Sequence, residues 1–365
     1  MKNCQRRANY SACEFNLASD MISDLIRSVN GNKTTRDGGC SMNDVLLSLK
    51  QDLKKIADFI IDKNDVLYFD YPLHLNVGDL LIYAGTEAFF KDNGINIRLR
   101  RCFQTFDVNE VKKYVNKNTT ILSHGGGNFG DLYPLLQQLR ESLVETFPDN
   151  RIIVLPQTAF FTNSQEMQKA SAVFARHKDC YLFARDTATQ EIMRHFSDNV
   201  YLSPDMAHQL YGSLPIKKIP SKNADNTLYF LRKDIEASHL EKEIQSKLPS
   251  SAAVKDWEDI LTKQDLRIEK IFSKLAKLAN KLHFSWLKDL INAQWYRYTL
   301  KVIERVQKEF SSYDLVVTTR LHGHIFSCLL GIPNQVCDNS YGKNMGYYKQ
   351  WTKQIDYAQP YENKQ

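Results

Sequence analysis

The chain has 365 residues, of which 43% are hydrophobic and 25% charged, enough for about two folded domains. We expect neither a transmembrane helix nor a secretory signal, because no run of about 18 apolar residues occurs and residues 1–10 are polar and basic. The net charge of +6 is too small to indicate a nucleic-acid partner, and seven scattered cysteines favour reduced thiols in a cytoplasmic protein.

The first domain is predicted from alternating helix and strand patterns. Residues 1–40 are polar, with little apolar periodicity, and we expect them to form a flexible arm. From Val45 to Ile60, apolar residues recur at helical spacing. Short apolar runs then predict the strands of an N-terminal α/β domain over residues 41–212, at 66–69, 95–99, 120–123, 151–155, 181–184 and 200–202. Helical patterns separate these strands, which predicts a parallel sheet.

A second domain is predicted after residues 213–226, whose glycine, proline and polar residues are typical of a linker. Its strands are expected at 227–231, 252–254, 315–318 and 335–337, within a C-terminal domain over 227–346. Residues 347–365 are expected to form a tail or helix. The predicted fold class is therefore α/β, with two doubly wound Rossmann-like domains facing a cleft. Sheets of this kind bind ligands at the carboxyl ends of their strands.

The pattern Asn-x-Gly-Asp occurs twice, each time after a predicted strand, and a helix is expected to start after each copy. Three glycines precede the second copy; they let the backbone approach a ligand, and free N–H groups at a helix start favour an anion. A capped tight turn would explain one copy alone, whereas two copies favour a binding site. Neither a P-loop nor a dinucleotide fingerprint is present. The residues concerned are Asn76, Asp79, Gly125, Gly126, Gly127, Asn128 and Asp131.

The strand predicted at 315–318 delivers Arg320 and His322 to its carboxyl end, just before a helix expected over 325–330. An arginine fork suits a phosphate or carboxylate, and an imidazole can transfer a proton near neutral pH. The alternative is a structural ion pair for Arg320 and a core position for His322. His322 and His324 have no carboxylate or thiol at metal-ligand spacing, so we expect no metal site.

Further polar side chains follow other predicted strands. We expect the basic and acidic groups to meet in one inter-domain crevice, because strand ends of parallel sheets share one edge. Such a site suits a small, multiply anionic donor, with carboxylates left to act on hydroxyls. The basic groups are Arg185, Arg232, Arg320, His322 and Lys343, and the acidic ones are Asp79, Asp131 and Asp205.

In their order, these motifs resemble the polysaccharide pyruvyl transferase family. They run from Asn76 to Lys343 and read Asn-x-Gly-Asp, Gly-Gly-Gly-Asn-x-Gly-Asp, Pro-Gln-Thr, Arg-Asp, Ser-Pro-Asp, Leu-Arg-x-Asp, Arg-Leu-His-Gly and Asp-Asn-x-Tyr-Gly-Lys. The resemblance implies a GT-B-like fold with an N-terminal acceptor side and a C-terminal donor side. It also implies transfer of pyruvate from phosphoenolpyruvate to two sugar hydroxyls, giving a pyruvate ketal in a bacterial surface polysaccharide or exopolysaccharide.

The resemblance assigns donor binding to Arg185, His322 and Lys343, with Arg320 beside them; Arg232 is added from its strand-end position. Ketal formation needs one acid and one or more bases. His322 is the candidate acid or phosphate ligand, and the candidate bases are Asp79, Asp131 and Asp205. The loop residues Asn76, Gly125, Gly126, Gly127 and Asn128 are assigned to the acceptor side. No cofactor besides the donor is expected. Two alternatives stay open: a GT-B glycosyltransferase with a nucleotide-sugar donor, and a non-catalytic carbohydrate-binding protein.

Residues 261–301 hold nine basic and three acidic residues, and so the whole net charge of +6. At helical spacing, lysines fall on one face and an apolar set on another; the apolar set is Ile271, Leu275, Leu278, Leu282 and Trp286. One interpretation is a surface helix whose apolar face packs on the domain. The other is an interfacial helix attracted to anionic lipid. The second would place a cytoplasmic protein at the inner face of the membrane, beside a lipid-linked oligosaccharide acceptor.

Overall fold

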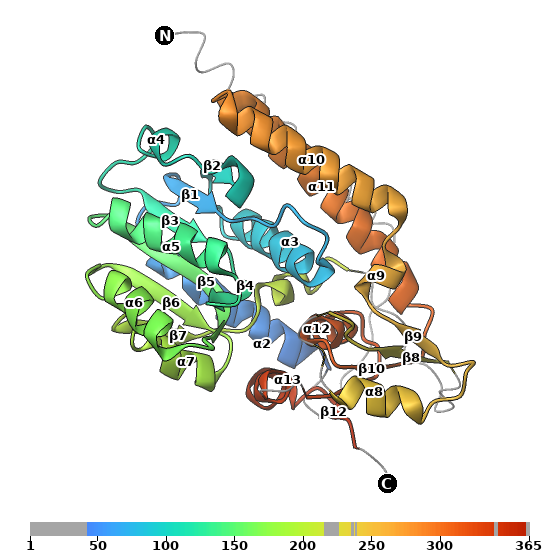
Figure 1. Cartoon of the computed structure of the whole chain (residues 1–365). Coiled ribbons are helices and arrows are strands. Elements are labelled where there is room, and N and C mark those ends of the chain that lie inside the picture. The colour runs from blue at the N-terminus through green and yellow to red at the C-terminus, as the bar shows by residue number, and fades with distance from the viewer. Residues whose placement is uncertain (1–41, 215–225, 235–236, 238, 339–341, 363–365) are drawn as a thin grey trace.

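The computed structural model describes residues 42–214, 226–234, 237, 239–338 and 342–362 (Figure 1). The expected arm at 1–40, most of the expected linker at 213–226 and residues 339–341 of the last predicted motif lie outside this part.

Two parallel β-sheets form the framework (Figure 1). The larger has the order β2-β1-β3-β5-β6-β7, with β4 paired to β5, and the smaller has the order β12-β11-β10-β8-β9. The strands of the larger sheet are β1 (Val66–Phe69), β2 (Ile97–Arg101), β3 (Thr120–Ser123), β4 (Gly126–Gly130), β5 (Arg151–Phe160), β6 (Cys180–Ala184) and β7 (Asn199–Leu202). Those of the smaller are β8 (Thr227–Phe230), β9 (Ala253–Lys255), β10 (Leu315–Thr318), β11 (Asn334–Val336) and β12 (Ala358–Pro360). The α/β class with parallel sheets is confirmed.

Helices connect the strands and cover the sheets (Figure 1). Those of the first half are α2 (Met42–Lys54), η1 (Lys55–Phe59), α3 (Val77–Asp92), η2 (Phe103–Thr105), α4 (Val108–Val111), α5 (Pro134–Thr146), α6 (Ser164–Phe174), α7 (Thr187–Met193) and η3 (Met206–Leu210). Those of the second half are α8 (His239–Ser246), α9 (Trp257–Ile260), α10 (Lys263–Lys281), α11 (Ser285–Phe310), α12 (Leu321–Leu329), α13 (Lys343–Tyr347) and η4 (Tyr348–Thr352). Of the described helices, none is both long and apolar enough to cross a membrane.

One hydrophobic core joins the two sheets. A continuous cluster of buried side chains includes Tyr68 of β1, Leu80 of α3, Trp295 of α11 and Val316 of β10. The helices α3 and α11 therefore pack between elements of both sheets, since burial of apolar surface is the main force that holds such elements together. Groups that come from different sheets are thus held at fixed positions relative to one another.

The second Asn-x-Gly-Asp copy differs from its prediction, because residues 126–130 form strand β4 and helix α5 begins only at Pro134. Strand β4 requires glycine at position 130. Gly130 has φ of 135°, and a Cβ there would lie 1.8 Å from the carbonyl oxygen of Phe160 on the paired strand β5. The first copy does start a helix: Asn76 is the N-cap of α3, and its Oδ1 accepts a hydrogen bond from the Gly78 N–H at 3.0 Å.

The chain ends do not follow the predicted domain boundaries. Strand β12 lies within the expected tail and pairs with β11, so the smaller sheet extends beyond residue 346. In addition, Leu46 and Leu49 of α2 pack with Cys328, Ile355 and Ala358 of the C-terminal half. The helix predicted to open the first domain therefore also rests on elements of the second sheet.

Candidate functional site

Three ionisable side chains meet where strands of both sheets end. Arg185 follows β6, Asp205 follows β7 as the N-cap of η3, and His322 lies in the first turn of α12, after β10. His322 Nε2 lies 3.2 Å from Asp205 Oδ2, and Arg185 contacts the same carboxylate oxygen. The predicted convergence of these residues across the two halves of the chain is present in the structure.

Arg185 and Asp205 are both fully buried, so each depends on its partners. The Arg185 guanidinium donates to Thr158 Oγ1 from Nε at 3.1 Å and from NH2 at 2.8 Å. Asp205 Oδ1 accepts from the Ala207 N–H at 2.8 Å. Burial opposes ionisation of Asp205, but the charges of His322 and Arg185 hold its pKa well below its usual range. Such an engaged anion favours a role in positioning His322 over the predicted role as a base.

Tyr347 and Trp351, near the C-terminus, hold the backbone of Asp205 and Arg185 in place. The Asp205 N–H donates to the hydroxyl oxygen of Tyr347 at 2.9 Å. The indole Nε1 of Trp351 donates to the Arg185 carbonyl oxygen at 2.6 Å. These contacts attach the residues that end α13 and form η4 directly to the strand ends of the larger sheet.

The glycines of both motifs leave room for the basic groups. A Cβ on Gly78 would lie 2.6 Å from His322 Nδ1. A Cβ on Gly127 would lie 2.9 Å from Lys343 Nζ and 3.4 Å from Arg185 NH2. A larger residue at either position would displace these side chains. The start of α3 therefore lies against His322, and the triple-glycine loop lies against Lys343 and Arg185.

Asp79 is the predicted carboxylate that faces the triple-glycine loop. A Cβ on Gly126 would lie 3.6 Å from Asp79 Oδ1, and Asp79 Oδ2 lies 3.7 Å from His74 Nε2. About a quarter of the Asp79 side chain is exposed, unlike that of Asp205. Of the three predicted bases, Asp79 combines proximity to the loop with an accessible carboxylate.

Buried polar side chains form hydrogen bonds that hold the triple-glycine loop in place. Gln157 Nε2 donates to the His124 carbonyl oxygen at 2.8 Å and to Asn128 Oδ1 at 3.0 Å. Arg140 NH2 donates to the Asn128 carbonyl oxygen at 2.9 Å. A Cβ on Gly125 would lie 2.7 Å from the Pro156 carbonyl oxygen. The predicted loop residue Asn128 therefore serves to fix the loop, because satisfied buried hydrogen bonds make it rigid.

Arg320 and Arg232 belong to a neighbouring ion-pair cluster. Arg320 binds Asp256 through Nε and, at 2.6 Å, through NH2, which also lies 2.9 Å from Asp234 Oδ2. Arg232 Nε lies 3.4 Å from Asp234 Oδ1. Arg320 thus forms the structural ion pair considered as the alternative, and its fork is occupied. Asp256 is 64 positions away in the sequence, so no local pattern indicates this pairing.

Asp131 and His324 also have structural partners. The Asp131 carboxylate accepts from the Thr162 N–H at 2.8 Å and the Asn163 N–H at 2.9 Å, which fixes the loop after β5. His324 is buried against Asn334 Oδ1 at 2.6 Å and Thr352 Oγ1 at 2.7 Å. Within the described residues, no three His, Cys, Asp or Glu side chains are grouped as a metal site.

A carboxyl group absent from the sequence prediction lies next to this site. Asp70 directly follows β1, is 5% exposed and has a φ of 69°. Its Oδ2 has no hydrogen-bond partner among the described residues. Burial raises the pKa of Asp70 to about 7; Arg140 opposes this rise and Asp79 adds to it. The strand-end rule applied to 66–69 would have identified Asp70.

A family model for polysaccharide pyruvyl transferases matches residues 76–341. The chain belongs to the polysaccharide pyruvyl transferase family. The resemblance of its motifs is thereby confirmed, and the protein is a transferase. The match includes the site from Asn76 to His322. Lys343 lies just after the matched region and Asp70 before it.

Relatives of this transferase cover most of its length. EpsO of Bacillus subtilis (strain 168), named as a pyruvyl transferase, is 36% identical over 330 residues, 87% of this chain and 97% of the relative. Pyruvyl transferase 1 of Schizosaccharomyces pombe is 27% identical over 299 residues, 78% of this chain and 69% of the relative. An uncharacterised Klebsiella pneumoniae protein of known structure matches 86% of this chain and 98% of its own, with a TM-score of 0.51 and 19% identity. This last similarity concerns the fold alone.

We expect Asp70→Asn to raise the melting temperature of the transferase at pH 8 and to raise it by a smaller amount at pH 5. The folded-state pKa of Asp70 is raised from 3.8 to about 7, so its stabilising protonated form is lost as the pH rises through about 7. That difference corresponds to at most about 4 kcal/mol at high pH. Asparagine keeps the shape and tolerates this positive φ. Thermal unfolding of both proteins from pH 5 to 8 measures the effect.

Asp131→Asn is the matched control. Burial opposes ionisation of Asp131, but hydrogen bonds from Thr162 and Asn163 lower its pKa, so its substitution should destabilise the protein at pH 8. An equal shift in melting temperature at pH 5 and pH 8 for Asp70→Asn would contradict a buried, mostly protonated carboxyl group.

Proposed function

We propose that this transferase moves pyruvate from phosphoenolpyruvate to two hydroxyls of a sugar, forming a pyruvate ketal during synthesis of a bacterial surface polysaccharide or exopolysaccharide. One observation carries the proposal: Arg185, His322 and Lys343, which come from both halves of the chain, converge on Gly78 and Gly127. Phosphoenolpyruvate carries a phosphate and a carboxylate, which are ligands for an arginine fork and a lysine point charge.

The proposed steps use these groups in the order that the chemistry requires. His322 donates a proton to the methylene carbon of the donor, and the first sugar hydroxyl attacks the adjacent carbon. The bond between this carbon and the bridging oxygen of the phosphate then breaks. The second hydroxyl attacks the same carbon and closes the ketal. Each hydroxyl releases its proton to Asp79; one of these protons then restores His322 and the other leaves with the phosphate. Asp79 is the proposed base, and Lys343 and Arg185 stabilise the departing phosphate.

The donor can be identified by thermal stability. We expect phosphoenolpyruvate to raise the melting temperature and nucleotide sugars to leave it unchanged, because a ligand that binds only the folded state stabilises it. Inorganic phosphate alone should give a smaller shift, since it lacks the carboxylate. Lys343→Ala should reduce the shift by phosphoenolpyruvate.

Two results would redirect the proposal. Stabilisation by a nucleotide sugar but not by phosphoenolpyruvate would favour the glycosyltransferase alternative. Binding of sugars without release of phosphate from phosphoenolpyruvate would favour the non-catalytic alternative. The thermal-stability measurement needs no acceptor. Release of phosphate is measured with a sugar acceptor present, for which we propose a lipid-linked oligosaccharide, and no cofactor besides the donor enters the proposed steps.

A further inference from the structure

Helices α10 and α11 form a hairpin (Figure 1), and a row of apolar side chains on this hairpin is exposed. On α10 it follows i, i+4, i+7 spacing, and it continues over the start of α11. Ile271 is 55% and Trp286 64% exposed. We name these residues the apolar row: Ile271, Leu275, Leu278, Leu282, Phe284, Trp286 and Leu290. The interpretation in which this face packs on the domain is therefore wrong.

Other residues hold the hairpin in place. Ala276 and Ala279, on a different face of α10, are fully buried. The expected single helix is broken around His283, which has a φ of 54°. At the start of α11, Lys288 Nζ lies 2.7 Å from Glu110 Oε2, and both side chains are largely buried. The α10–α11 hairpin that carries the apolar row is therefore packed against the protein, so the row is exposed although its helices are fixed.

This exposure is concentrated. Within the described part of the chain, eight of the fifteen exposed large apolar side chains lie between Leu266 and Leu290. Single exposed apolar residues are ordinary on a protein surface, whereas a contiguous set marks a site of interaction. The hairpin therefore presents a surface that is suited to contact an apolar phase or partner.

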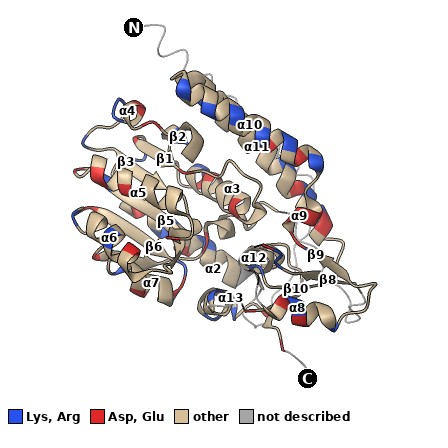
Figure 2. Cartoon of the chain, in the orientation of Figure 1, with Lys and Arg blue, Asp and Glu red and all other residues tan. Residues whose placement is uncertain are grey.

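A row of lysines runs beside the apolar row. Figure 2 shows blue positions along α10. These lysines are exposed, and most lie one position before a residue of the apolar row, which places them about 100° away around the helix. Of the two acids of α10, Asp265 is buried and paired with Arg305 at 2.7 Å, and Glu269 is half-buried, so the lysines outnumber the acids at the surface. The lysines are Lys263, Lys270, Lys274, Lys277 and Lys281.

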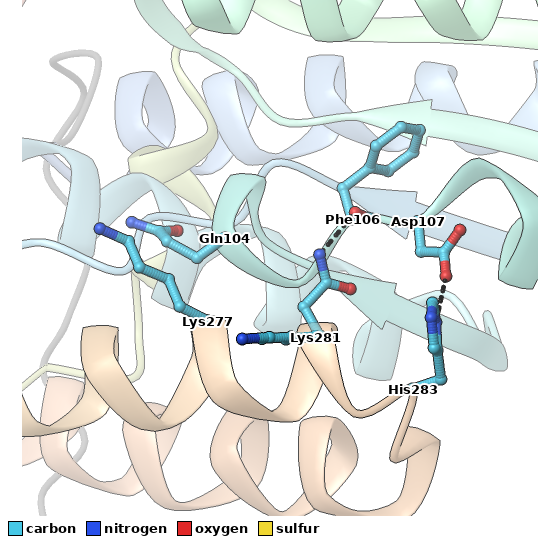
Figure 3. A pocket seen from close by; sticks show the side chains of 7 residues that line it. Gln104, Phe106, Asp107, Lys277, Lys281 and His283 are labelled. Atoms are coloured by element: carbon cyan, nitrogen blue, oxygen red, sulfur yellow. Dashed lines mark hydrogen bonds and ion pairs between the residues drawn. The ribbon is translucent and has the colours of Figure 1, made fainter.

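A hollow of about 420 Å³ opens at the end of the lysine row (Figure 3). Lys277, Lys281 and Asn280 line it on the hairpin side, and Asn280 Nδ2 donates to the Phe106 carbonyl oxygen at 3.1 Å. Its one lining acid, Asp107, lies 3.0 Å from His283 Nδ1. The hollow can hold an anionic headgroup beside the two lysines, next to the apolar row.

We propose that the α10–α11 hairpin docks on an anionic membrane surface. The apolar row would enter the boundary between headgroups and acyl chains, and the lysines would bind lipid phosphates. A second copy of the chain fits this surface less well, because an isologous dimer would set one net basic hairpin against another. The docking is independent of the proposed donor chemistry and would bring the enzyme to a lipid-carried sugar.

Vesicle flotation of the full chain tests the proposal. We expect binding to vesicles of phosphatidylcholine with 30% phosphatidylglycerol, weak binding to phosphatidylcholine alone, and release in high salt. Each lysine-to-glutamine change should weaken binding by about fivefold, the equivalent of about 1 kcal/mol per charge. Lys274→Gln with Lys277→Gln and Leu278→Ser with Trp286→Ser are the test variants. Trp286 should also shift its fluorescence to shorter wavelength on binding.

Controls separate docking from folding and catalysis. Leu135→Ser on α5 and Lys169→Gln on α6 change side chains of similar exposure away from the hairpin and should bind as the wild type does. All variants should keep the wild-type melting temperature and the same release of phosphate from phosphoenolpyruvate. Absence of vesicle binding, or binding that the row substitutions leave unchanged, would overturn the proposal. Self-association that is abolished by Leu278→Ser with Trp286→Ser would instead assign the row to a contact between copies.

Discussion

His322→Ala is expected to slow release of phosphate from phosphoenolpyruvate by about 10²- to 10⁴-fold, the typical cost of removing a general acid. The imidazole lies at the start of α12 and contacts Asp205 at 3.2 Å, so rigid elements hold it at the junction of the two sheets. Asp205 keeps Arg185 and the Ala207 N–H as partners when the ring is removed. The fold should therefore survive.

The measurements are phosphate release per folded molecule and melting temperature. His324→Ala is the matched control, because His324 is two positions away and has buried partners in Asn334 and Thr352. It should lower the melting temperature with a smaller effect on turnover. A His322→Ala protein that melts much earlier, yet turns over normally, would identify His322 as a structural histidine.

Gly78→Ala should reduce turnover by about 10²-fold without loss of stability. The new Cβ would lie 2.6 Å from His322 Nδ1, so the ring must move, and a displacement of about 1 Å at a catalytic group can cost this much. Gly78 lies in the first turn of α3, where alanine is the better helix former, so the melting temperature should not fall. The rate at saturating donor should fall more than the affinity for the donor.

Gly346→Ala serves as the comparison, since its Cβ would meet nothing nearer than Asp186 Cβ at 4.0 Å. That variant should have wild-type turnover. Normal turnover in Gly78→Ala would show that the position of the His322 ring does not limit the reaction.

Much of the fold could be predicted from sequence because the central strands of a parallel sheet are buried on both faces. Strands β1 and β3 have the predicted bounds, and each of their residues is buried. The strands that escaped prediction lack such runs. Strand β4 consists largely of glycine and depends on pairing with β5, and β12 has only three residues, of which one is proline. Their structure comes from tertiary contacts that local patterns do not contain.

The site could be predicted where its residues follow strand ends, and less well where a partner decides the role. Arg185, His322 and Lys343 meet as expected, because the sheets bring their strand ends together. Arg320 also follows a strand end, yet its guanidinium forms an ion pair with Asp256. On α10, periodicity identified an apolar face, but the small side chains of Ala276 and Ala279 allow the closest approach and determine which face packs.

The contacts of Tyr347 and Trp351 with the backbone of Asp205 and Arg185 have a consequence for the order of biosynthesis. During translation, the larger sheet leaves the ribosome long before these two residues are made, and domains generally fold as they emerge. At that stage Arg185 and Asp205 lack His322, and their backbone lacks the hydrogen bonds to Tyr347 and Trp351. The nascent protein therefore carries an incomplete site, which is completed only after the segment that contains α13 and η4 has joined the larger sheet.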